Sequence, residues 1–167
     1  GVVESIFGCY WKTITVRGEV SHPSTPMERR KDAGLAACRI VTDISRHVEE
    51  AYQGRATVTC GKMRFHPDEI NAIPSRAVFS LDFRSGQQQC FDELDTWLEE
   101  EIAQVERAYR VTVEQEVFSN TPPTPSDGAV VSAIRTAAQE LGLGWKMMSS
   151  GAGHDAMIFA KVWPMGM

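Results

Sequence analysis

The most constraining feature of this sequence is the order in which alternating and helical apolar patterns follow one another. Between Trp11 and Val20, Ile14 and Val16 alternate with polar residues, and the segment from Ala77 to Arg84 alternates without a break. Strict alternation predicts strands that bury one face. Each of these strands therefore needs a second layer against which its apolar side chains can pack.

Two predicted helices supply that layer. The first is expected to start near Met27, and the second covers roughly residues 89–109. In both, apolar residues recur every three to four positions, which places them on one stripe of a helix. The stripe residues are Ala33, Ala37, Ile40, Ile44, Val48 and Ala51 in the first helix and Phe91, Leu94, Leu98, Ile102, Val105 and Tyr109 in the second.

Two further strands complete the pattern. The alternation between Thr57 and Phe65 changes parity at Gly61, which indicates a bulge or a bend, and residues 111–117 form the last strand. The order strand, helix, strand, strand, helix, strand predicts an α+β fold of the split βαβ (ferredoxin-like) type over residues 11–119. We expect two layers, with two helices on one face of a four-stranded antiparallel sheet.

A proline-rich linker, NTPPTPSDG, follows this domain at residues 120–128. The elements predicted beyond it are a helix over 130–141, a strand over 145–148, a helix over 157–161 and the opening of another strand at 163–167. About 40 residues cannot close a core of their own. We therefore expect residues 1–10 and 120–167 to be partial α/β segments of one second domain, truncated from a longer protein.

Charge and apolar content exclude some classes of partner. The net charge is −5, and no basic stripe interrupts the acidic balance, so we expect no nucleic acid partner. No apolar run approaches the ~18–20 residues that cross a bilayer, and the first residues lack a signal-peptide pattern, so we expect no membrane partner. The four cysteines form no CxxC pair, which indicates buried free thiols and a cytoplasmic location.

Three residues of the predicted domain could contact a ligand, and each has a structural alternative. His22 follows a strand in a proline-flanked loop, where a surface histidine is the alternative. Asn71 could offer its amide to a ligand or stabilise a turn. Arg84 ends a strand on its polar face and could bind a carboxylate through two hydrogen bonds, or pair with Asp82.

The stretch SSGAGHDA (149–156) brings a histidine and an aspartate to the start of a helix. His154 and Asp155 could form a hydrogen-bonded pair at the rim of a pocket, and capping of the helix by Asp155 or Ser150 is an equal alternative. His47, on the first predicted helix among charged residues, is expected to face solvent. The four histidines show no metal-ligand spacing, so we expect this chain to bind no metal.

Several motifs occur together in one order: HPSTPM (22–27), RRKDA (29–33), NAIP (71–74), FSLDFR (79–84) and SGAGHDA (150–156). With these motifs the sequence resembles the dinuclear-metal amidohydrolases, which include N-carbamoyl-L-amino-acid hydrolase, allantoate amidohydrolase and β-ureidopropionase. The resemblance covers almost the whole chain. It implies a catalytic domain interrupted by a split βαβ lid domain that also forms a homodimer.

The resemblance also implies roles for single residues. His22 looks like the lid histidine that reaches the partner subunit's active site and polarises the scissile carbonyl, Asn71 like an asparagine that hydrogen-bonds substrate, and Arg84 like the arginine that grips its carboxylate. The turn residues Gly151, Ala152, Gly153 and His154 resemble a loop that lines the substrate pocket. The family usually has Ala-Gly after the lid histidine, where this chain has Pro23 and Ser24.

The function implied is hydrolysis of a C–N bond in an N-carbamoyl amino acid, allantoate or a similar ureido carboxylate. Two divalent metal ions, zinc or manganese, are implied for the complete enzyme, whereas no ligand set is recognisable here, so we expect this part alone to be inactive. An aminoacylase or dipeptidase of the same superfamily is the alternative within this class. A stand-alone module that dimerises or binds a small ligand is the alternative from another class.

Overall fold

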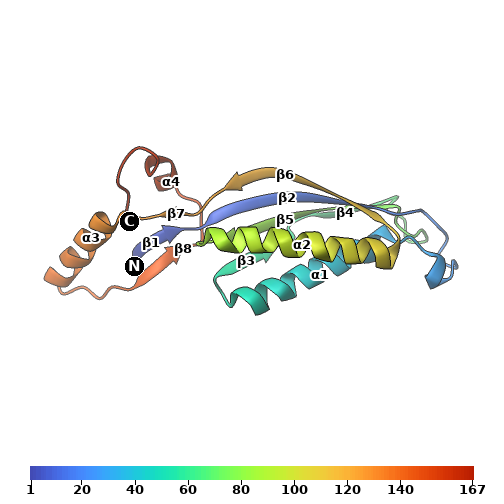
Figure 1. Ribbon diagram of the computed structural model, residues 1–167, viewed down its shortest axis with the longest axis horizontal. Coiled ribbons are helices and arrows are strands. Elements are labelled where there is room, and N and C mark those ends of the chain that lie inside the picture. Colours follow the sequence, from blue (N-terminus) through green and yellow to red (C-terminus); the bar gives the residue numbers. More distant parts are fainter.

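Most of the chain forms one antiparallel sheet with two long helices on a single face (Figure 1). The computed structural model describes all residues, Gly1–Met167. The elements of this two-layer part are β2 (Gly8–Arg17), η1 (a 3-10 helix, Met27–Arg29), α1 (Ala33–Tyr52), β3 (Ala56–Thr59), β4 (Met63–His66), β5 (Arg76–Ser85), α2 (Gln88–Tyr109) and β6 (Thr112–Thr121). The predicted α+β, ferredoxin-like arrangement is confirmed.

The strands follow the order β3-β5-β2-β6, and β4 pairs with the same edge of β5 as β3 does. β2 and β5 run antiparallel over their full length, from Gly8 opposite Ser85 to Arg17 opposite Arg76. The sheet therefore extends somewhat beyond the residues 11–119 expected from the pattern. Because β3 and β4 share one edge, they act as a single interrupted strand, and the interruption at residues 60–62 contains the glycine at which the parity was seen to change.

The alternation in the sequence correctly identifies the buried face of the sheet. Residues Ala77, Phe79, Leu81 and Phe83 of β5 are all at most 4% exposed, and they belong to one core of 22 buried residues between the sheet and the helices. At about 1.5–3 kcal/mol for each large apolar side chain removed from water, this core dominates the stability of the domain. The domain needs no other part of the chain to bury its apolar face.

Three details of the helices differ from the sequence-based expectation. Residues from Met27 form only the short η1, and α1 begins at Ala33, because the Asp32 side chain accepts a hydrogen bond from Leu35 N and caps the helix there. At the other end of α1, Tyr52 is buried and Ala51 is exposed. His47 does not simply face solvent: its ring stacks on Trp97 of α2 with 4.2 Å between centroids.

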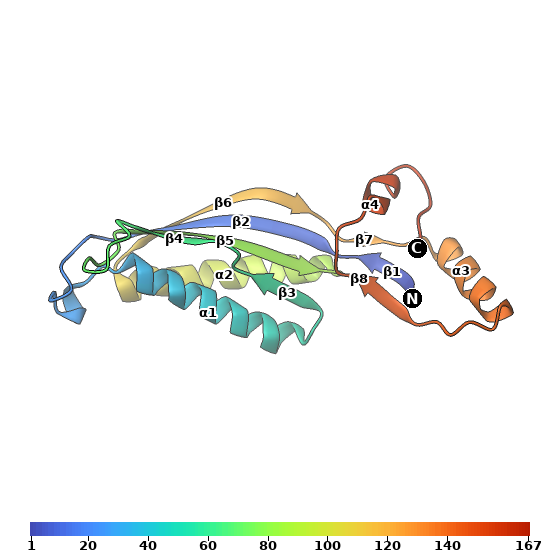
Figure 2. The ribbon, with the colours of Figure 1, turned by 180° about the vertical axis from the view of Figure 1, so that it is seen from behind.

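The two ends of the chain meet in a second, small sheet. The sheet consists of β1 (Val2–Ile6), β7 (Thr124–Pro125) and β8 (Met147–Ser150). This part of the chain also contains the helices α3 (Gly128–Glu140) and α4 (Ala156–Phe159). β1 lies in the middle, antiparallel to β7 and parallel to β8. This small sheet continues one end of the large one, and Figure 2 shows α3 and α4 beside it.

The predicted strand at 163–167 is absent. This tail instead folds back, with Met165 buried against Ile6 and Ala156 and with Met167 O accepting a hydrogen bond from Val3 N. β8 begins two residues later than expected.

Of the four cysteines, all free, Cys90 alone is buried, so the expectation of buried thiols holds for one. None of the helices is both long and apolar enough to span a membrane.

Candidate functional site

His22 and Asn71 lie together at one end of the large sheet, which we call the distal end. They belong to different loops, one after β2 and one between β4 and β5, and both are at least partly exposed. A backbone bridge joins the loops, because Ile73 N donates to Ser21 O at 2.8 Å. Residues that are 49 positions apart in the sequence are thereby brought to adjoining loops at one end of the sheet.

The His22 ring is held by its own loop. Ser24 N donates to His22 Nδ1 at 3.2 Å, and Ser24 Oγ lies 2.7 Å from the same nitrogen. The loop carbonyls are held in turn by Arg30, whose Nε donates to Thr25 O at 2.8 Å and whose Nη2 donates to Pro23 O at 2.6 Å. The ring is therefore oriented with Nδ1 turned toward its loop.

Arg84 lies at the opposite end of the sheet, near the small sheet, which we call the proximal end. Its Nε and Nη2 both donate to the Asp82 carboxylate, with Nη2 at 2.9 Å from Oδ2. Its Nη1 points to the glycine-rich turn and donates to Gly151 O at 3.4 Å. The structure thus contains the ion pair given above as the alternative, while one edge of the guanidinium faces the turn.

The groups around Asp82 favour its charged form. Burial raises the pKa of Asp82, but hydrogen bonds from Arg84 and Trp11 outweigh burial and leave the pKa below its ordinary value. Next to it, Cys9 Sγ lies 3.7 Å from Asp82 Oδ1, and burial together with the Asp82 charge raises the pKa of Cys9 to about 11. Cys9 is therefore a protonated thiol that donates to Asp82, and it is not a nucleophile.

The glycine-rich turn is open to solvent and faces Arg84. Gly151, Ala152, Gly153 and His154 are all exposed. The Asp155 side chain caps no helix; instead His154 Nδ1 accepts a hydrogen bond from Ala156 N at 3.1 Å. The Ser150 hydroxyl donates to Ala152 O, so it does not cap the helix either. Both capping alternatives are therefore wrong for this turn.

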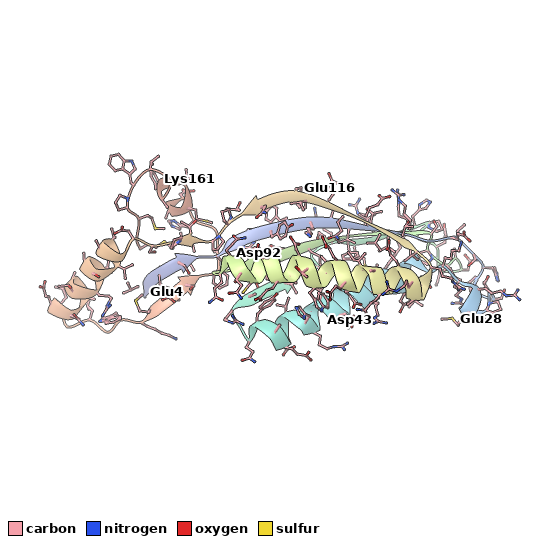
Figure 3. The ribbon with its side chains drawn as sticks, in the orientation of Figure 1. Glu4, Glu28, Asp43, Asp92, Glu116 and Lys161 are labelled. Atoms are coloured by element: carbon pink, nitrogen blue, oxygen red, sulfur yellow. The ribbon has the colours of Figure 1, made fainter.

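The two pairs of candidate residues are far apart in one chain. The ten residues of β5 separate them, and a strand of this length spans about 33 Å. Figure 3 makes the separation visible, because its labelled Glu28 marks the distal end and its labelled Glu4 and Lys161 mark the proximal end. A single ligand of ordinary size cannot contact both ends of one copy.

Ser24 and Arg30 hold the His22 loop, but no sequence pattern gives them a role. Their contacts depend on the path of the loop, which no periodicity reports. Metal ligation finds no support in these residues, since no three His, Cys, Asp or Glu side chains converge anywhere in the chain. The side chains present therefore do not fit the two-metal centre that the resemblance implies.

The sheet order, the helix layer and the polar residues at both ends define a ferredoxin-like α+β domain with ligand-binding candidates at its tips. Comparison with known families then identifies it. A model of the Peptidase dimerisation domain matches residues 5–110, and the chain belongs to that family.

The proteins similar to this chain are named as hydrolases or amidases. N-carbamoyl-L-amino-acid amidohydrolase of Rhizobium meliloti is 35% identical over 168 residues, covering 100% of this chain and 40% of the relative. Ureidoglycolate hydrolase of Oryza sativa subsp. japonica is 30% identical, covering 100% and 35%. A crystal structure of an amidase of the hydantoinase/carbamoylase family from Burkholderia multivorans superposes with a TM-score of 0.91 at 34% identity, covering 99% and 40%. The chain thus spans about 40% of the length of such relatives.

Proposed function

We propose that this chain is part of an amidohydrolase that cleaves a C–N bond in an N-carbamoyl amino acid, allantoate or a related ureido carboxylate. Residues 11–119 would form its lid and dimerisation domain, and residues 1–10 and 120–167 would contribute to its catalytic domain. The observation that carries the proposal is the division of the candidate residues between the two ends of the sheet. A second copy of the lid is needed to bring those ends together.

Two-fold symmetry can provide this. The large sheet has two free edges, β6 on one side and β3 with β4 on the other. When an edge strand pairs with its own copy about a two-fold axis, the two strands run antiparallel. The distal end of one sheet then lies alongside the proximal end of the other. The partner's His22 and Asn71 would thereby approach Arg84 and the glycine-rich turn.

Such a composite site suits a small carboxylate-bearing amide. Asp82 holds the Nε edge of Arg84 and leaves the Nη1 side toward the turn, where a substrate carboxylate could accept charge-assisted hydrogen bonds. His22 would donate to the carbonyl oxygen, on which negative charge develops during attack at the carbon. Asn71 and His154 would fix the remaining polar atoms of the substrate.

The metal ions implied by the resemblance have no ligand set among these residues, and none of the steps above depends on them. What the chain itself supplies is substrate orientation and stabilisation of the developing oxyanion. Removal of a single oxyanion donor typically lowers kcat about 10²–10³-fold. A loss of that size is expected for His22→Ala in the longer protein.

Mixed dimers test the composite site directly. His22→Ala and Arg84→Ala subunits should each be nearly inactive as homodimers, whereas co-expression should restore activity. If half of the dimers are mixed and each has one intact site, about one quarter of wild-type activity is expected. Recovery requires that His22 and Arg84 act from different subunits, so mixed dimers that remain inactive would refute the arrangement.

The role of Arg84 is tested by substrate choice. Arg84→Ala should lower kcat/KM for a carboxylate substrate strongly and for the matched neutral amide much less, because hydrogen bonds to charged groups contribute about 1.5–3 kcal/mol. Arg84→Lys should fall between, since lysine keeps the charge and loses the fork. Equal losses for both substrates would mean that the pairing with Asp82 is the whole role of Arg84.

A further inference from the structure

The peptide unit between Pro23 and Ser24 has a defined partner on each side. Its carbonyl oxygen accepts a hydrogen bond from Arg30 Nη2 at 2.6 Å, and its N–H donates to His22 Nδ1 at 3.2 Å. In a planar trans peptide the C=O and N–H point in opposite directions. Arg30, the peptide and the His22 ring therefore form one chain of contacts in which fixing the carbonyl also fixes the direction of the N–H.

In the neutral His22 ring that fits this chain of contacts, the proton is on Nε2. A nitrogen that accepts a hydrogen bond carries no proton, so Nδ1 must be the acceptor and Nε2 the donor. The Ser24 hydroxyl, 2.7 Å from Nδ1, can rotate to donate to the same lone pair or to accept from Nδ1–H when the ring is protonated. In both ring states Nε2–H remains available outward.

No ion pair competes for the ring. Charged and titratable residues lie on the segments beside His22 and on the end of α2 that contacts its loop, and none of them forms a salt bridge with the ring. They are Glu19, Glu28, Arg29, Arg30, Lys31, Asp32, His66, Asp68, Glu69 and Arg110. The only side chain that hydrogen-bonds the ring is Ser24. The tautomer of His22 is therefore set by neutral donors of its own loop.

We propose that Ser24 and Arg30 are positioning residues that hold His22 with Nδ1 as acceptor and present Nε2–H to an acceptor oxygen of the ligand. This inference rests on the proposed function of His22 and deepens it by naming the two residues that orient the ring and the ring nitrogen that donates. It also explains how an exposed loop keeps a donor oriented. Arg30 acts through the backbone, and Ser24 acts through its hydroxyl and its N–H.

His154 provides a comparison within the same molecule. Its Nδ1 also accepts a backbone N–H from two residues further on, Ala156 N at 3.1 Å, but no hydroxyl assists. Both rings therefore present Nε2, and only the His22 ring has a side chain that holds it. A change at Ser24 or Arg30 should alter one histidine and leave the other unchanged.

The test is long-range ¹H–¹⁵N correlation NMR of the histidine side chains in the 167-residue chain, in alkaline buffer where the rings are neutral. A His22→Gln sample assigns the His22 signals. Wild-type His22 should be almost entirely the Nε2–H tautomer. Ser24→Ala should raise the Nδ1–H fraction roughly threefold to tenfold, the effect of one neutral hydrogen bond. Ser24→Thr, which keeps the hydroxyl, should restore the wild-type ratio.

Arg30→Lys provides an independent second variant, because lysine cannot bridge the two loop carbonyls as the guanidinium does. It should also raise the Nδ1–H fraction of His22 while His154 stays as in wild type. Unchanged His22 tautomer ratios in both Ser24→Ala and Arg30→Lys would overturn the positioning role.

The measurement does not use activity, so it separates this inference from the proposed function. A changed tautomer ratio together with full activity of His22→Ala in the longer protein would leave the positioning in place and remove the catalytic role. An unchanged tautomer ratio together with an inactive His22→Ala enzyme would remove the positioning role of Ser24 and Arg30 and leave the catalytic role of His22 in place.

Discussion

The two sheets of this molecule differ most in what lies behind them. The large sheet buries a core of 22 residues beneath α1 and α2, whereas the small sheet has a cluster of three buried residues, Ile6, Ala156 and Met165. α3, which lies beside the small sheet, has no buried residue at all. Large apolar side chains there remain open to water, among them Leu141, Ile158 and Trp163, which are 73%, 66% and 70% exposed.

This difference shows which part of the chain can be stable alone. Apolar area removed from water is the main source of folding free energy, and the lid has nearly all of it. The relatives are more than twice as long as this chain, and we expect the exposed apolar surface of α3, α4 and the tail to be covered in a protein of that length. We therefore expect the lid to unfold cooperatively and the small sheet to open separately at a lower free energy.

The largest expected effect on stability comes from a pair of substitutions, one in each sheet. They replace two isoleucines that are both 0% exposed, Ile14 of β2 and Ile6 of β1. Ile14→Ala should lower the free energy of unfolding of the lid by about 2–5 kcal/mol, because it leaves a cavity in a closed core. Ile6→Ala should change the same transition by less than about 1 kcal/mol, since β1 opens separately. Urea titrations followed by tryptophan fluorescence and circular dichroism give both numbers, and equal losses would show that the two sheets unfold together.

The two side-chain helix caps sharpen the comparison at a smaller scale. Asp32 caps α1 and is buried, while Asp127 caps α3 by accepting from Ala129 N and Val130 N. Asp32→Ala should lower the free energy of unfolding of the lid by about 1–2 kcal/mol. Asp127→Ala should leave the lid unchanged and show only as faster amide exchange within α3. A cost to the lid from Asp127→Ala would mean that α3 is coupled to the large core.

The smallest expected effect is a gain in stability within the lid. Glu101 of α2 is 6% exposed, and its Oε1 is buried without a hydrogen bond. Arg39 Nε lies 3.7 Å from Glu101 Oε1, but Arg39 already forms a closer ion pair with Asp43. Burial, and then the neighbouring Asp43, raise the pKa of Glu101. Glu101→Gln should therefore raise the unfolding free energy at neutral pH by up to about 1 kcal/mol, while exposed Glu100→Gln should have no effect.

The sign of the pH dependence follows from the direction of that pKa. A carboxyl group whose pKa is raised by folding binds more protons in the folded state, so its contribution is fully present below the pKa of the unfolded chain and is lost as pH rises through the folded pKa. Stability of the wild type relative to Glu101→Gln should therefore fall from acidic to neutral pH. A constant difference across that range would contradict the raised pKa.

Much of the lid was predictable because its signals are local. The alternation around Phe79 and the stripe containing Leu98 each report burial on one face, and both residues are buried. The start of α1 was misplaced because Met27 satisfies a helical pattern, while the cap at Asp32 decides where the helix begins. The apolar residues of the tail after Trp163 predict a strand, and their pattern does not indicate that the tail folds back on β1.

The candidate site was predictable only as single residues. Motif resemblance singled out His22, Asn71, Arg84 and the glycine-rich turn, and their roles stay predictions. Their division between two ends of a sheet follows from the length of β5 and its antiparallel pairing with β2, which the motifs alone do not report. The contacts of Ser24 and Arg30 depend on the course of one loop. The pairing of Arg84 with Asp82 is one of the two alternatives that the sequence leaves open, and the structure contains it.

The junction between the two sheets has a mechanical consequence. The chain passes from one sheet to the other through Phe7 and through Pro122–Pro123, and these crossings lie against each other: a Cβ on Gly8 would stand 2.6 Å from Pro123 N and 2.7 Å from Thr121 O. If the two sheets rotate relative to each other, two crossings packed this closely would act as a single hinge, and the large sheet would extend about 30 Å from it. A rotation of roughly 10° at the hinge would carry the tip of this sheet by about 5 Å, a distance large enough to make or break every hydrogen bond at its far end.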